Sequence, residues 1–191
     1  LRYYLLKEVS FGNDGNISEE KLENCINSDL ANNFGNLCQR VSSFVIKNCE
    51  SKIPIDIKFE NDDLQILEKY EKNIDIIRKN VDDLNVNSYV NFIINSLFEA
   101  NKYFNDQEPW AKKGDLVRMN TIVYTTMEIV RKICIMLFPI IPESTLKALK
   151  IFDLNENDII FKTIVNHRFL KNGKKINKIE ILFKKVERDN D

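Results

Sequence analysis

Two polar side chains in the stretch NNFGNLCQR have the types and spacing needed to read exposed nucleic-acid bases. Asn36 and Arg40 lie four residues apart, so on a helix they are stacked neighbours on one face. They fall roughly 95–135° from the centre of that helix's apolar stripe, which directs them outward or into a side groove. An amide and a guanidinium together supply the donors and acceptors that base edges require. Spacing alone equally allows two ordinary solvated residues.

An aromatic group could complete such a site. Trp110 is the only tryptophan of the chain and follows Pro109 at the end of the helical stretch ANKYFNDQEPW. A tryptophan in that place can offer a plane on which a base stacks. It can also act as a core plug that closes the end of the helix, and the local pattern does not separate the two interpretations.

Residues for other chemistry are few. His167 is the only histidine, so a histidine pair for metal is impossible, and we expect a lone surface residue. The four cysteines show no C-x-x-C pair, which argues against zinc and favours free thiols, buried where they fall on helical patterns. They are Cys25, Cys38, Cys49 and Cys134. We therefore expect no catalytic residues, no metal site and a reduced, cytoplasmic protein.

The elements that would position these residues are helices. Apolar residues recur every three or four positions, which predicts a mainly α protein built as an antiparallel helix bundle. The expected helices cover residues 1–9, a segment capped by Ser18, a segment from near Ser28 to Val45, 62–84, about 87–104, about 115–138, and a shorter 143–152. The longest apolar run, ICIMLFPII, is too short to span a membrane. With a net charge of −1, binding to nucleic acid requires a local site, since no global attraction exists.

The C-terminal stretch KIEILFKKVE follows a different period. Ile179, Ile181 and Phe183 alternate with polar residues, which predicts a short strand at residues 178–187. From residue 162 onward the chain holds nine Lys and Arg against four Asp and Glu. This basic excess could face a nucleic-acid backbone, or it could be a solvated end of the chain.

Three stretches in order carry a family resemblance: LRYYLLKEVSFGNDG, NSDLANNFGNLCQR and FEANKYFNDQEPW. Together they resemble the region of methionyl-tRNA synthetases that follows the class I catalytic core. The PIIP turn near residue 140 is similar to the family's later helices. The resemblance implies three parts: residues 1–25 end the stem-contact region, 26–150 form the anticodon-binding bundle, and 151–191 form a C-terminal return segment.

The resemblance also implies a function for the site. The family reads the CAU anticodon of methionine tRNAs with residues that match Asn36, Arg40 and Trp110. Asn36 and Arg40 would hydrogen-bond base edges, and Trp110 would stack on the first anticodon base. The implied partner is the anticodon stem-loop of tRNA(Met).

The ATP-binding signatures of the family, His-Ile-Gly-His and Lys-Met-Ser-Lys-Ser, do not occur in this sequence. The resemblance thus implies a full-length enzyme that joins methionine to its tRNA with ATP and Mg²⁺, bound by a catalytic domain outside these residues. We expect this chain to be inactive alone and to have no cofactor. We also expect a monomer without membrane contact, because no appended tRNA-binding domain follows Asp191.

Two other functions stay open from the residues. One is the anticodon-binding domain of another class I synthetase, since the leucine, valine, isoleucine and cysteine enzymes share the bundle. The other is a helical protein-interaction module with no RNA partner.

Overall fold

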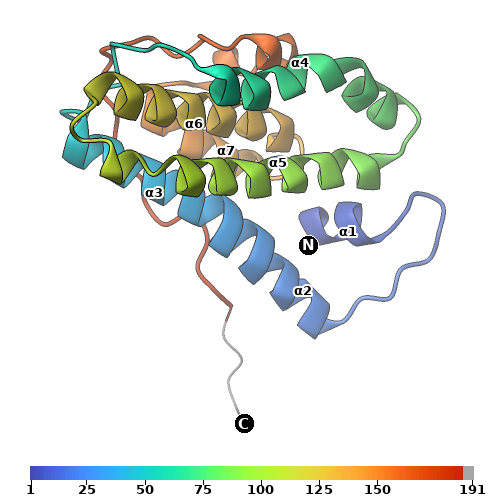
Figure 1. Ribbon diagram of the computed structural model, residues 1–191. Coiled ribbons are helices and arrows are strands. Elements are labelled where there is room, and N and C mark those ends of the chain that lie inside the picture. Colours follow the sequence, from blue (N-terminus) through green and yellow to red (C-terminus); the bar gives the residue numbers. More distant parts are fainter. Residues whose placement is uncertain (187–191) are drawn as a thin grey trace.

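A computed structural model describes residues 1–186, and four long helices form its body (Figure 1). These are α3 (Asn36–Asn48), α4 (Asn61–Asp82), α5 (Val86–Gln107) and α6 (Leu116–Leu137). Helix α6 packs against each of the other three, and α4 also packs against α5. The predicted mainly α helix bundle is confirmed.

The N-terminal part is one short helix followed by a long continuous one. After α1 (Arg2–Glu8), the chain forms α2 (Glu19–Cys25), a π-helical stretch η1 (Ile26–Gly35) and then α3 as a single rod (Figure 1). Ser18 caps this rod as predicted, since its Oγ accepts the Lys21 N–H at 3.2 Å. The prediction of a new helix near Ser28 is wrong. The segment contains no Pro, and its one glycine, Gly35, keeps a helical φ of −61°, so the backbone stays helical, and its widened π turns shift the apolar period.

Helix α6 lies at the centre and buries charged residues as well as apolar ones. Glu128, Arg131 and Lys132 are each 0% exposed. Arg131 Nε donates to Glu128 Oε2 at 2.8 Å. Because a buried charge is costly unless it is paired and hydrogen-bonded, these groups need further partners.

The partners come from the return segment, residues 151–186, which has few regular elements. The guanidinium of Arg131 donates to the carbonyl oxygens of Thr163 at 3.0 Å and Asn166 at 3.1 Å. The carboxylate of Glu128 accepts the N–H of Leu170 at 2.6 Å. The segment follows α7 (Pro142–Leu149) and contains the 3-10 turns η3 (Lys150–Phe152), η4 (Glu156–Asp158) and η5 (Phe161–Val165), together with an isolated antiparallel bridge between Lys175 and Lys52. Hydrogen bonds from side chains of α6 to the backbone of the return segment thus hold this segment in place without a sheet or a long helix.

The predicted strand at residues 178–187 is wrong for its described part, 178–186, which has no regular secondary structure; Glu187 lies outside the described residues. Residues 1–186 contain no regular strand with which it could pair, so the segment docks through other contacts. The ring of Phe183 lies 6.2 Å from that of Phe34. The side chain of Asn27 donates to the carbonyl of Val186 at 2.9 Å and accepts its N–H at 2.8 Å.

The hydrophobic core runs through all three predicted parts. Tyr3 and Tyr4 of α1, Phe34 of the rod, and Leu170 and Ile176 of the return segment belong to one cluster of buried residues. The boundaries at residues 25 and 150 therefore stay predictions from the family resemblance.

The buried ion pair generates a stability prediction. Replacing Arg131 by Ala leaves the Glu128 carboxylate buried without its cation and removes the anchors of the return segment. We expect the free energy of unfolding to fall by about 3–5 kcal/mol in urea denaturation. Lys147→Ala, a truncation at an exposed site on α7, is the control and should change it by less than about 0.5 kcal/mol. Equal effects of the two substitutions would contradict the anchoring role.

Lys132 generates a pH prediction. Burial, and then the neighbouring Arg131, lower the pKa of its ammonium group to about 7, while Glu128 and Glu71 act in the opposite direction. Between pH 7 and 8.5 the unfolded chain keeps this proton and the folded chain releases it, so stability rises with pH. We expect a rise of about 1–2 kcal/mol in the free energy of unfolding over this window. Lys132→Met should flatten the slope, and an unchanged slope would count against the assignment.

Candidate nucleic-acid interface

The interface lies where α3 meets the C-terminal end of α5 (Figure 1). Asn36 is the first residue of α3 and is exposed, and Arg40 follows one turn later, half-buried. Lys47 is exposed two turns further along the same flank. The outward direction predicted for Asn36 and Arg40 from the helix period matches these exposures.

Phe104 of α5 brings Arg40 and Trp110 together. Its ring is 2% exposed, and the Arg40 guanidinium carbon lies 5.3 Å from its centroid. The Trp110 ring meets the same ring edge-on, with 6.0 Å between centroids. Phe44 of α3 also packs on it edge-on at 6.0 Å. One buried ring thus supports both a cation and an indole by cation–π and aromatic contacts.

A hydrogen bond fixes the direction of Arg40. Its Nη2 donates to Oδ1 of Asn105, an exposed residue of α5, at 2.6 Å. A guanidinium has five N–H donors, so this bond orients the group and leaves donors for a ligand.

Trp110 is placed by a sharp helix exit. Glu108, the residue that follows α5, has the left-handed conformation, with φ 46°, and Pro109 then starts the 3-10 turn η2 (Pro109–Ala111). The turn carries Trp110 out of the bundle, where 43% of its side chain is exposed. The interpretation of Trp110 as a core plug does not fit this exposure.

Sequence reasoning missed the residues of α5 that complete the interface. Asn101 donates to Oδ1 of Asn33 at 2.6 Å, and Asn33 is 6% exposed with an Nδ2 that has no partner in the described part of the chain. Asn105 bonds Arg40, as described above, and lies four residues after Asn101. That spacing was the available signal, because it puts both amides on one face of α5.

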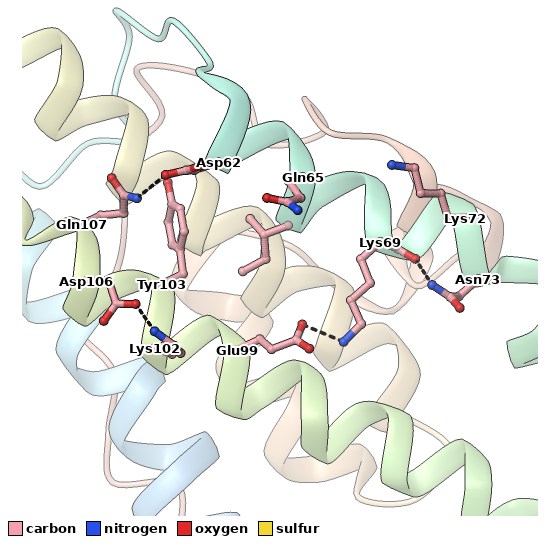
Figure 2. Close-up of a pocket in the computed structure, with 11 residues that line it drawn as sticks. Asp62, Gln65, Lys69, Lys72, Asn73, Glu99, Lys102, Tyr103, Asp106 and Gln107 are labelled. Carbon is pink, nitrogen blue, oxygen red and sulfur yellow. Dashed lines mark hydrogen bonds and ion pairs between the residues drawn. The ribbon is translucent and has the colours of Figure 1, made fainter.

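A groove of about 580 Å³ near this interface lies between α4 and α5 (Figure 2). Its lysines are neutralised by acidic neighbours: Lys69 pairs with Glu99 at 2.7 Å, and Lys102 pairs with Asp106. Lys72 likewise pairs with a glutamate on its own helix. The groove therefore offers a nucleic acid little uncompensated positive charge, and it does not extend the interface.

The remaining candidates for chemistry are held inside the protein. All four cysteines are free thiols, as predicted, and burial raises the pKa of Cys25 to about 12 and that of Cys49 to about 11. His167 differs from the predicted surface residue. It is half-buried, with Nδ1 3.3 Å from Lys132 Nζ, and burial followed by the charge of Lys132 lowers its pKa.

Among residues 1–186, no group of three or more His, Cys, Asp and Glu side chains could hold a metal ion. No helix in the same range is long and apolar enough to cross a membrane. The interface provides hydrogen-bond donors, acceptors and a stacking plane, which are the groups that bind unpaired bases.

The helix bundle has the fold of an anticodon-binding domain of a class I aminoacyl-tRNA synthetase. Residues 53–191 match the family described as the anticodon binding domain of methionyl tRNA ligase, and residues 1–42 match the class I (M) tRNA synthetases. The chain belongs to the methionyl-tRNA ligase family, which confirms the resemblance seen in its motifs.

Individual relatives agree. The methionine–tRNA ligase of Brucella suis is 44% identical over 79% of this chain and 30% of its own length. That of Rickettsia felis is 38% identical over 99% of this chain and 38% of its own length. The crystal structure of free Mycobacterium tuberculosis methionyl-tRNA synthetase superposes with a TM-score of 0.91, at 32% identity, over 98% of this chain and 38% of that one. The chain thus spans about a third of the relatives it matches.

The shared contact with Phe104 generates a prediction. In Phe104→Leu the ring current and the cation–π contact disappear, so the NMR signals of the Trp110 indole and the Arg40 side chain should both shift. The free energy of unfolding should fall by about 1–2 kcal/mol. Phe44→Leu is the matched control, because Phe44 touches Phe104 but neither of the two reporters in the contacts described above. If both signals stay in place in Phe104→Leu, the shared support is refuted.

Proposed function

We propose that this chain recognises the CAU anticodon of methionine tRNAs as the C-terminal part of a methionine–tRNA ligase. The observation that carries the proposal is the position of Arg40 and Trp110 on one buried ring, which aligns a hydrogen-bonding fork with a stacking plane. In this proposal Trp110 stacks on the first anticodon base, while Asn36 and Arg40 hydrogen-bond base edges. Membership of the family supports the CAU sequence as the target.

The full-length activity is part of the proposal, because the chain covers only 30% and 38% of the length of the two relatives compared. That activity is the ATP-dependent attachment of methionine to tRNA(Met). The residues of this chain do not fit an ATP site, since neither signature of the family occurs in them. ATP and Mg²⁺ therefore belong to the catalytic domain of the same polypeptide, which is the second proposed partner.

The proposed working form is a monomer in the cytoplasm. Four free cysteines, three of them buried, suit a reducing compartment. The protein's contacts with tRNA would then come from one copy of the chain, since Asn36, Arg40 and Trp110 all belong to a single bundle.

The single tryptophan allows a direct test. The chain is titrated with a CAU anticodon stem-loop while Trp110 fluorescence is followed, with a hairpin changed at the first anticodon base as the control. We expect strong quenching by the CAU hairpin and little by the control, because stacking requires the splayed base at Trp110. Equal binding of a valine anticodon would overturn the proposed CAU specificity, and no response to any hairpin would overturn anticodon recognition at Trp110.

Affinity gives the size of the effect. Stacking on an aromatic side chain contributes roughly 1–3 kcal/mol per base, so Trp110→Ala should weaken CAU hairpin binding about ten- to a hundredfold. Isothermal titration calorimetry measures this without a tryptophan signal. Phe11→Ala removes an aromatic side chain that is 74% exposed at a distant turn, and it should leave the affinity unchanged.

A further inference from the structure

The loop that carries Trp110 is closed at both ends by one residue. Arg118, in the first turn of α6, donates from Nη2 to Oε1 of Gln107, the last residue of α5, at 2.6 Å. Its backbone N–H donates to Oδ1 of Asp115, the residue before α6, at 2.9 Å. Trp110 lies between these two anchored residues. Arg118 therefore links the start of the loop to its end.

Arg118 is itself fixed inside the protein. Its Nη1 lies 2.6 Å from Oδ2 of Asp63, a residue of α4 that is 0% exposed. The same carboxylate accepts the hydroxyl of Tyr103 and the backbone N–H of Glu60. A buried ion pair with these added hydrogen bonds keeps the guanidinium in one position. The loop is thus tied to an anchor shared by α4, α5 and α6.

Both ends of the Gln107 side-chain amide are held by protein partners. Its Oε1 accepts from Arg118, and its Nε2 donates to Oδ2 of Asp62 at 3.1 Å, as Figure 2 shows for the second bond. These two bonds join the end of α5 to α4 and to α6, so Gln107 is placed to hold the start of the loop.

Consecutive backbone hydrogen bonds connect the two ends of the loop. They join Ala111 to Glu108 at 2.9 Å, Lys112 to Pro109 at 3.1 Å, and Asp115 to Lys112 at 2.9 Å. The backbone around Trp110 is thus linked by short turns to Asp115 on one side and to the end of α5 on the other.

We propose that Gln107 and Arg118 form a clasp that holds the Trp110 loop in its RNA-binding arrangement, which makes Gln107 a positioning residue. The effect of the clasp on RNA binding rests on the proposed function. The effect of the clasp on the position of Trp110 can be measured in the free chain, without RNA. Ordering a side chain before binding lowers the entropic cost of binding it. Release of the clasp should weaken CAU hairpin binding about three- to tenfold.

The first experiment uses the free chain. Gln107→Ala removes the clasp and leaves the buried Arg118–Asp63 pair in place, so the fold should persist with an unchanged thermal midpoint. Time-resolved fluorescence anisotropy should show a larger nanosecond motion of Trp110 in this variant. Gln65→Ala, the same substitution at an exposed site on α4 beside the same groove, is the control and should leave the motion unchanged. Unchanged Trp110 motion in Gln107→Ala would overturn the clasp.

The second experiment is a double-mutant cycle with the CAU hairpin, measured by calorimetry. If Gln107 acts through Trp110, Gln107→Ala weakens binding in the wild-type background and adds no loss in the Trp110→Ala background. An equal loss in both backgrounds would overturn the positioning role. If Trp110→Ala itself leaves the affinity unchanged, the proposed function fails, and the anisotropy result still decides the clasp.

Discussion

The buried ion pair of Glu128 and Arg131 is the interaction on which the rest of this structure depends. It lies on α6, the central helix, and neither side chain is exposed. Water cannot satisfy these charges, so the backbone of the return segment does, through Thr163, Asn166 and Leu170. A stretch of chain with little secondary structure of its own is thereby held on the bundle. Other arrangements of the return segment would leave these buried charges without partners, so the ion pair favours this one arrangement.

The same helix uses a second buried pair at its other end. Arg118 and Asp63 meet there, and the proposed clasp to Gln107 extends this pair to the surface. Phe104 supports the interface through apolar contacts, because its ring packs against Arg40 of α3 and against Trp110 at the exit of α5. The side chains that we propose to bind RNA are therefore held in place by residues that do not themselves contact it in this proposal. Such support lowers the entropic cost of ordering an interface.

The charge distribution fits a domain that reads bases more than phosphates. The chain has a net charge of −1, and the lysines of the groove beside the interface are paired with acidic neighbours. Phosphate contacts would need uncompensated cations and carry no sequence information. Amide, guanidinium and indole groups instead distinguish and stack on unpaired bases. The proposed recognition of an anticodon uses these groups.

The sequence by itself determined the helices, their apolar faces and the family, because a 3.6-residue period and ordered motifs are local properties of the chain. It also singled out Asn36, Arg40 and Trp110 as site residues, a prediction that still awaits its binding test. Only the tertiary structure decided that Phe104 joins Arg40 to Trp110, and that His167 is half-buried. It also replaced the predicted strand by an irregular segment and joined two predicted helices into one. Each of these outcomes depends on partners distant in sequence, and a local pattern holds no information about which groups the fold brings together.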